Sequence, residues 1–580
     1  MRSASITTRS RSFISLIPQL AAILIAAITP ACAGDAGADG ANGLPGGNGS
    51  DGPPGEDGTD GTEGPQGDPG ESVFVDQSLS PLEKAFVGIG GEDLVAGLTS
   101  MEVTSAGARW LPGESFRPTD AAPKVSTFDA SLSFDLAADS LRVDYTRDIN
   151  LLGLMVQTNF SEIVAGDVGV VEGVEGIFGG PPSSDMVSER WGTTRRHQRL
   201  LHPHLILRDI AADPTLVLDD RGVALLDGSV HHLLVVSDPV SPVTLWVSAA
   251  TGWIGKVALK ENDPLHRDVD VEAFFYGWGT TGAGGLRFPS DAYIAHDGYI
   301  VHQEKRTEIA VNAPIAGDLF AFPAGASPSY DAEAAHRGHA NNEAFQLWLG
   351  SGLPIYDGQQ TFVQATELSP GVHYLTGGSH NSMMVDQANG LVLIEAPLEQ
   401  GRSEAILAWA ETVYPGKPVT HVVTTHHHSD HSAGVRTILA AGATSVISEV
   451  SVEYFKEIFA APSQVYPDAL ELNPVDFGIE AVTMGGSHTI ADPARPVVLH
   501  HIPTAHCADM LIVHVPSAQV VFNSDMLNPG NPIVLSFPQS AMELHSGIVG
   551  AGIAAPDLKL VGGHGAGPNT FAEFEAALGL

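Results

Sequence analysis

The sequence predicts an α/β protein in which a mostly antiparallel β domain precedes a domain of alternating strands and helices. Two patterns indicate this fold class. Apolar and polar residues alternate along many stretches of residues 73–339, whereas apolar runs alternate with helical stretches along residues 340–580. The chain has 580 residues, and a single core rarely grows beyond ~250–300 residues, so more than one domain is expected.

The charge balance restricts the kind of partner. The chain has 28 Lys and Arg residues against 68 Asp and Glu residues, which gives a formal net charge of −40. Neutralising a phosphate backbone needs clustered basic side chains. The composition therefore argues against a nucleic-acid partner and favours a small-molecule substrate.

Residues 1–33 have the pattern of an export signal. Basic residues precede the apolar stretch 20–28, which is shorter than the ~20 residues of a membrane-spanning helix. Two interpretations of its end stay open. Cys32 becomes the lipidated N-terminus of a lipoprotein, which anchors the protein to a membrane of the cell envelope, or Ala31–Ala33 is an ordinary cleavage site and the protein is secreted.

Residues 34–72 form a repetitive spacer. Every third residue from Gly34 to Gly70 is glycine, which resembles collagen, whose triple helix needs glycine at each axial position. One interpretation is a stalk that assembles a homotrimer. The other, which we favour, is a flexible acidic tether, because the segment is short and carries acids without any base.

Strand patterns dominate residues 73–339. In the stretch 128–136, apolar residues alternate with Asp and Ser, as expected for a strand with one buried face. This succession of strands is similar to the curved half-barrel of lipoprotein-carrier-like domains. Further strands are expected at 243–247, 254–259, 271–278, 292–294 and 307–311.

One basic stretch interrupts this acidic domain. The sequence RRHQRLLHPH, residues 195–204, could bind an anion, and His202 with His204 could hold a metal. We expect instead a solvated loop, because no carboxylate or cysteine at ligand spacing accompanies the histidines.

Strands and helices alternate along residues 340–580, which predicts a layered α/β domain in which ligands gather at strand ends. Helical stretches are expected at 402–414 and 435–442. Strands are expected at 372–375, 383–385, 391–394, 419–423, 445–447, 497–502, 510–515, 519–522 and 558–561.

Histidine and aspartate side chains follow four of these strands. If the chain stays extended after strand 419–423, its period of two places His426, His428 and Asp430 on one side. Two zinc ions joined by a bridging carboxylate can use about seven protein groups, so the count fits a dinuclear site. The candidate ligands are His426, His428, Asp430, His431, His506, Asp525 and His564.

The motif THHHSDHSAG, residues 425–434, followed by a later His, a later Asp at a strand end and a final Gly-His-Gly, resembles the metallo-β-lactamase superfamily from Val372 onward. The resemblance implies an αββα sandwich and a zinc-dependent hydrolase. It implies that His426, His428 and His506 hold the first metal. Asp430, His431 and His564 would hold the second, Asp525 would bridge the two, and Asp430 would also act in catalysis.

Several positions near this motif call for separate predictions. Glu395 stands where the superfamily usually has Asp, in a supporting role. His427 is expected to face solvent, and Cys507 to be a small buried filler. His380 and Asn381 could face the substrate, or be a turn residue and its cap.

The resemblance implies that a hydroxide bound to two zinc ions cleaves a lactone, lactam, ester or related bond of a small molecule. Iron or manganese could replace zinc, and oxidoreduction at a di-iron centre is one alternative. Another alternative is a surface adhesion or scaffold protein whose metal site is structural or inactive.

Overall fold

A computed structural model describes residues 74–580, except 152–153, 178, 239–240, 281–283, 338–339, 341–361 and 536. The predicted export signal with Cys32 and the Gly-x-y spacer lie outside the described residues. Residues 73–580 form one compact unit. Among the described residues, no helix is long and apolar enough to cross a membrane.

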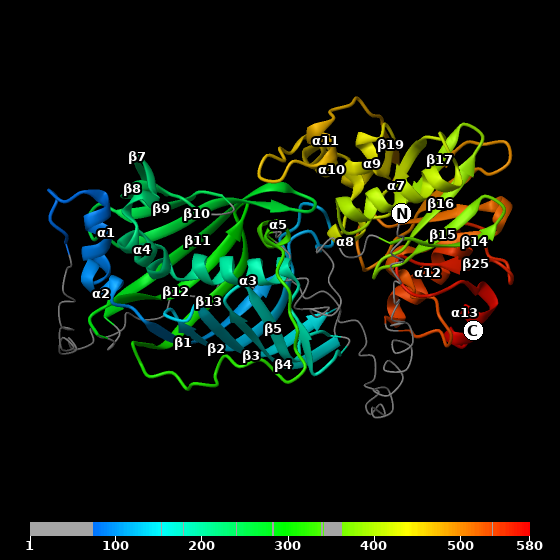
Figure 1. The fold of residues 1–580 in the computed structure, drawn as a ribbon. Coiled ribbons are helices and arrows are strands. Elements are labelled where there is room, and N and C mark those ends of the chain that lie inside the picture. Colours follow the sequence, from blue (N-terminus) through cyan, green and yellow to red (C-terminus); the bar gives the residue numbers. More distant parts are fainter. Residues whose placement is uncertain are drawn as a thin grey trace, which may run out of the picture. The chain divides into compact units, whose positions relative to one another are not determined.

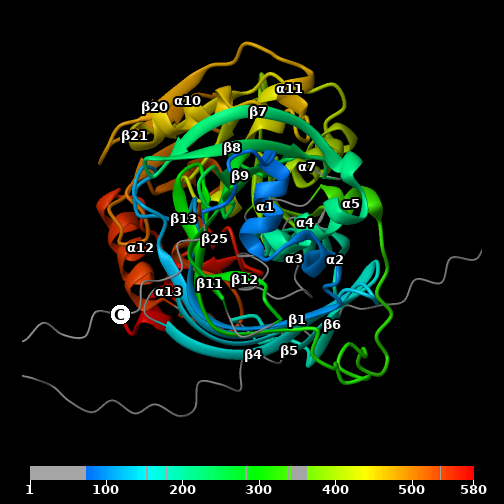
Figure 2. The same cartoon turned by 90° about the vertical axis from the view of Figure 1, so that its left-hand side faces the viewer.

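The first part of this unit is a single antiparallel sheet of 13 strands (Figures 1 and 2). Its order is β6-β5-β4-β3-β2-β1-β13-β12-β11-β10-β9-β8-β7, so the first and last strands pair in the middle, and β6 and β7 form the two edges. The strands are β1 (Ser100–Trp110), β2 (Lys124–Asp135), β3 (Ser140–Leu151), β4 (Leu154–Ala165), β5 (Val168–Val174), β6 (Ser183–Asp185), β7 (Val217–Leu226), β8 (Ser229–Val236), β9 (Val243–Ser248), β10 (Ile254–Asp263), β11 (Arg267–Thr280), β12 (Arg287–His296) and β13 (Tyr299–Val311).

The sheet curves around helices that cover its buried face (Figure 2). In β2, Phe128 and Leu132 are buried whereas Asp129 and Ser131 are exposed, which confirms the predicted alternation. The buried residues form one core with apolar residues of the covering helices, such as Leu201. The helices of this part are α1 (Pro81–Ile89), α2 (Glu92–Ala96), α3 (Ser188–Leu201), α4 (Pro203–Ala212) and α5 (Ala332–His336).

The basic stretch 195–204 is part of this helical layer, so the prediction of a solvated loop is wrong. It runs from α3 into α4, and His202 and His204 are both buried. The arginines of this stretch can be buried because carboxylates of the sheet neutralise their charges. Arg196 Nε, for example, lies 2.6 Å from Glu261 Oε1. Desolvation lowers the pKa of His202 to about 3 and of His204 to about 4. Within the described residues, the groups that could hold a metal lie elsewhere.

The C-terminal part contains two mixed sheets packed face to face (Figure 1). One follows the order β14 to β20 and is parallel from β17 to β20, whereas the other follows the order β21 to β26. The strands are β14 (Gln364–Ser369), β15 (Val372–Thr376), β16 (Ser382–Gln387), β17 (Gly390–Ile394), β18 (Val419–Val423), β19 (Thr444–Ser448), β20 (Ile479–Val482), β21 (Ser487–Ile490), β22 (Val497–His501), β23 (Leu511–Val515), β24 (Val520–Phe522), β25 (Lys559–Val561) and β26 (Asn569–Thr570).

Helices cover the outer face of each sheet. Apolar residues of α7, α9 and α10 form a core with the first sheet, and those of α12 and α13 form a core with the second. The predicted αββα sandwich is therefore present, and it places the carboxyl ends of β18, β22, β24 and β25 near one another. The helices are α7 (Gln400–Val413), α8 (Ser429–Ser432), α9 (Val435–Ala440), α10 (Val452–Ala460), α11 (Ala469–Leu472), α12 (Pro538–Gly550) and α13 (Phe571–Leu578).

Candidate metal centre

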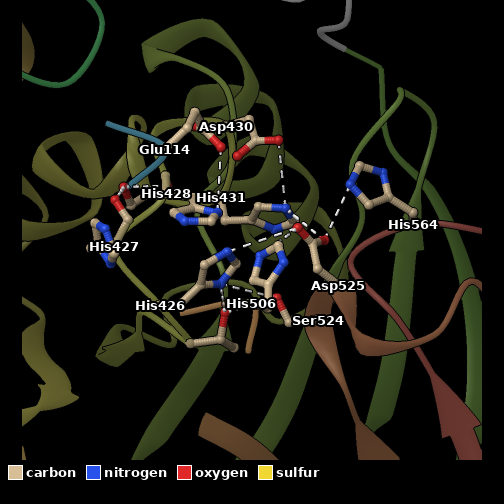
Figure 3. A network of polar contacts seen from close by, with 12 residues as sticks. Glu114, His426, His427, His428, Asp430, His431, His506, Ser524, Asp525 and His564 are labelled. Carbon is tan, nitrogen blue, oxygen red and sulfur yellow. Dashed lines mark hydrogen bonds and ion pairs between the residues drawn. The ribbon is translucent and has the colours of Figure 1, made fainter. Parts of the chain in front are cut away.

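The seven predicted ligands come together where these four strands end (Figure 3). After β18 the chain bends at Thr425 and His426, passes through His428 with φ −56° and ψ 141°, and then turns into α8, which carries Asp430 and His431. The extended run that the sequence pattern assumed is therefore interrupted. His506 follows β22, His564 follows β25, and Asp525 lies in the short helical turn Ser524–Met526 after β24.

Among the described residues, possible ligand atoms form three groups, each with its atoms within 4.8 Å of one another, and the third group consists of Glu395, His426 and His431. The first group is His426, His428, His506 and Asp525, and the second is His380, Asp430, His431 and His564. The first and second groups match the two predicted metal positions, with His380 added to the second.

Asp525 faces the first and second groups through different oxygens (Figure 3). Its Oδ2 lies 3.4 Å from His506 Nε2 and 3.8 Å from His426 Nε2. Its Oδ1 lies 2.8 Å from His431 Nε2 and 3.3 Å from His564 Nε2. This is the placement that a bridging carboxylate needs.

Hydrogen bonds fix which ring nitrogen each histidine offers. His431 Nδ1 lies 2.9 Å from Glu395 Oε2, His564 Nδ1 lies 2.9 Å from Ser379 O, and His428 Nε2 lies 3.1 Å from Ser115 O. A ring N–H that donates to such an acceptor leaves the opposite nitrogen free to bind a metal. The free nitrogens are Nε2 of His431 and His564 and Nδ1 of His428.

The electrostatics around the first group of ligands also favour metal binding. Desolvation, followed by nearby histidines, lowers the pKa of His426 and lowers that of His428 to about 3, so both rings stay neutral. Burial raises the pKa of Asp525, but His431 and His564 outweigh burial and hold it well below its usual range. Neutral imidazoles and ionised carboxylates are the forms that bind metals.

Several buried atoms that face this centre make no hydrogen bond of good geometry within the described part of the chain, although some of them lie close to one another. Buried polar atoms are nearly always satisfied in proteins, and a pair of divalent metals would satisfy these. The residues therefore fit the metals that the resemblance implies. The atoms are His426 Nε2, His431 Nε2, His506 Nε2, Asp430 Oδ1 and Asp525 Oδ1.

Glu395 lies beneath the centre, in the expected supporting position. It is fully buried, and its Oε1 accepts hydrogen bonds from Thr425 Oγ1 at 2.7 Å and Ser524 Oγ at 2.6 Å. Because its Oε2 holds His431, one side chain connects the loops after β17, β18 and β24.

His380 and Asn381 are both buried. His380 Nε2 lies 2.9 Å from Asp430 Oδ2 within the second group of ligands. The amide of Asn381 donates to Tyr374 Oη at 2.6 Å and to Gly565 O at 3.0 Å. Asn381 therefore supports the loop that carries His564.

His427 is buried, so the prediction that it faces solvent is wrong. Its Nδ1 lies 2.9 Å from Asp509 Oδ1, and Ser451 Oγ donates to the other oxygen of this carboxylate. Asp509, three residues after His506, makes the burial of a polar ring at this position favourable. Cys507 is buried as predicted, and burial followed by Asp509 raises the pKa of its thiol.

Replacing His427 with alanine is expected to lower the free energy of unfolding by about 1–3 kcal/mol, because the buried Asp509 loses its partner. Metal content should stay at the wild-type value. Thermal unfolding together with metal analysis checks this, with His488→Ala at a half-buried surface position as the control. Loss of metal from a variant of unchanged stability would contradict the structural role.

Glu114 also reaches this centre (Figure 3), although no sequence pattern singles it out. It belongs to the loop between β1 and β2 of the 13-stranded sheet. Its Oε2 lies 3.4 Å from His428 Nδ1. Only the folded chain reveals this contact, because the two residues are far apart in the sequence.

Two packed sheets with histidine and aspartate side chains clustered at one edge form a site that could hold metal ions. The family model of the metallo-beta-lactamase superfamily matches residues 375–564. These residues therefore form a domain of that superfamily.

Solved structures of metallo-beta-lactamases are similar to part of this chain. The metallo-beta-lactamase FIM-1 from Pseudomonas aeruginosa, in its mono-zinc form, is 16% identical, with a TM-score of 0.29 over 38% of this chain and 94% of that chain. A metallo-beta-lactamase from Pontibacter korlensis is 21% identical, with a TM-score of 0.28 over 38% of this chain and 98% of that chain.

Proposed function

We propose that the C-terminal domain is a metal-dependent hydrolase that cleaves a lactone, lactam, ester or related bond of a small molecule. The observation that carries this proposal is the placement of Asp525, whose two oxygens face separate groups of histidines. A site that had become purely structural would not need to keep a complete second group of ligands around a bridging carboxylate.

The first metal would be held by His426, His428 and His506, and the second by Asp430, His431 and His564, with Asp525 shared. Imidazole and carboxylate ligands suit zinc, and also iron or manganese. Two such metals supply a water of lowered pKa and a Lewis acid that stabilises the developing oxyanion.

The residues around the ligands prepare this chemistry. Asp430 is held by His380 through Oδ2, which leaves its buried Oδ1 free to orient the attacking water. Glu395 fixes the ring of His431, so the ligand geometry exists before a substrate binds. Among the seven ligands, the side chain of His564 is the most exposed, at 28%, followed by those of Asp430 at 16% and Asp525 at 15%, so a substrate would approach from the side of His564.

The purified chain is expected to contain about two equivalents of divalent metal. A chelator should abolish hydrolysis of whichever substrates a panel of lactam, lactone, ester, thioester, phosphodiester and sulfate-ester probes reveals, and added zinc should restore it. Elemental analysis measures the metal content. A chain that contains no metal, or whose hydrolysis resists the chelator, would contradict the proposal.

We also propose that the protein is exported, on the pattern of residues 1–33. The spacer 34–72 would then separate the folded part from its anchor or from other chains. Labelling cells with a radioactive fatty acid distinguishes a lipoprotein modified at Cys32 from a secreted protein, and the mass of the mature protein in solution distinguishes a monomer from a trimer.

A further inference from the structure

The turn Gly113–Phe116 of the β1–β2 loop lies against both loops that carry the ligands of the first metal position. Gly113 O accepts a hydrogen bond from Ser429 N at 3.2 Å, and Phe116 O accepts one from Ala508 N at 2.8 Å. Ser115 O lies 3.1 Å from His428 Nε2. Three backbone carbonyls of this short turn, those of Gly113, Ser115 and Phe116, therefore contact the segments that carry His428 and His506.

Glu114 places its carboxylate inside this contact (Figure 3). Oε1 accepts two hydrogen bonds from Ser429, from the backbone N at 3.1 Å and from Oγ at 2.9 Å. These bonds direct Oε2 toward His428 Nδ1, at 3.4 Å, and the side chain is only 12% exposed. His428 Nδ1 is the nitrogen that the Ser115 carbonyl leaves free for the metal.

The position of this charge matters energetically. A carboxylate close to a divalent metal attracts it strongly where water is largely excluded. No group of possible ligand atoms among the described residues includes Glu114, so its carboxylate would act beside the first metal without replacing a ligand. Burial, followed by Asp430, raises the pKa of Glu114, and a bound metal would favour its ionised form. Groups of this kind fix ligands in place and raise metal affinity.

We propose that Glu114 is a positioning residue of the metal centre, which strengthens metal binding at the His426, His428 and His506 position and holds His428 through Ser429. The proposal rests on the proposed metal-dependent function. It makes the 13-stranded sheet a contributor to the centre, since Glu114 lies outside residues 375–564, which carry the superfamily match.

The test compares metal binding by the full chain and by Glu114→Gln, which keeps the shape and an acceptor for Ser429 but removes the charge. We expect one of the two equivalents of zinc to bind about 10–100-fold more weakly, measured by competition with a coloured chelator, whereas the other keeps its affinity. The visible spectrum of the cobalt-substituted protein should change for that same equivalent. Asp120→Asn is the matched control, because Asp120 is exposed in the same loop.

Glu114→Asp provides a second variant. It keeps the carboxylate, but its shorter side chain places that carboxylate farther from His428. An affinity between those of the wild type and Glu114→Gln supports the proposal. Wild-type affinity for both equivalents in Glu114→Gln overturns it, and so does an equal loss at both equivalents with a lowered melting temperature. A wild-type chain that binds no zinc is a different result, because it refutes the proposed function itself.

Discussion

Replacing Asp525 with alanine is expected to remove the metal pair and to lower hydrolysis roughly a thousandfold, because several kcal/mol of transition-state stabilisation depend on the bound metals. Among the described residues, Asp525 is the one side chain whose two oxygens reach histidines of both groups, His506 on one side and His431 on the other. Its loss therefore weakens both positions together. Elemental analysis and kcat/KM on the best substrate of the panel measure the effect.

The control for this experiment is Asp476→Ala, which removes an exposed carboxylate from the same domain. Its metal content and activity should equal those of the wild type. Circular dichroism should show that the Asp525 variant is still folded. If Asp525→Ala kept both metals and full activity, the assignment of a shared carboxylate would fail.

The largest expected effect on stability is at Arg436. Its guanidinium binds Asp468 through two nitrogens, at 2.5 and 3.2 Å, and donates to Ile458 O and Phe459 O at 2.8 and 2.9 Å. Both side chains of the pair are almost fully buried. Replacing Arg436 with alanine leaves Asp468 buried without its main partner, which is expected to cost about 3–5 kcal/mol of unfolding free energy.

Urea unfolding followed by tryptophan fluorescence measures this loss. The matched control is Lys456→Ala, whose exposed ion pair with Glu453 spans 2.7 Å on the nearby helix α10, and which is expected to change stability by less than about 1 kcal/mol. Similar losses for the two variants would show that burial of the Arg436 pair does not matter.

The sequence was enough to predict that the seven candidate residues lie close together, because each follows a strand and the carboxyl ends of these strands meet at one edge of the sandwich. The alternation in β2 likewise predicted its buried face. The prediction for His427 was wrong because its partner, Asp509, comes from another loop. The spacing within THHHSD does not show that a carboxylate lies beside His427. The stretch 195–204 was misjudged for the same reason, since Glu261, which compensates Arg196, lies on a strand far along the chain.

Glu114 shows a further limit of sequence reasoning. Its neighbours Gly113 and Ser115 carry no metal-binding signature, and its partners His428 and Ser429 belong to another domain of the prediction. Contacts of this kind depend on how a loop of one sheet meets the loops of another. Local propensity and spacing do not determine that geometry, so only the folded chain reveals it.

The central pairing of β1 with β13 leaves the 13-stranded sheet with two free edges, and both discourage strand addition by a neighbouring molecule. The β6 edge, Ser183–Asp185, is too short to template another chain. The β7 edge carries exposed Leu218, Val223 and Leu225, but its register with β8 shifts twice, at Val217/Asp219 and Asp220/Val223. Such bulges interrupt the row of backbone donors and acceptors. A protein held at high local density on a surface would therefore resist joining into fibres along its largest sheet.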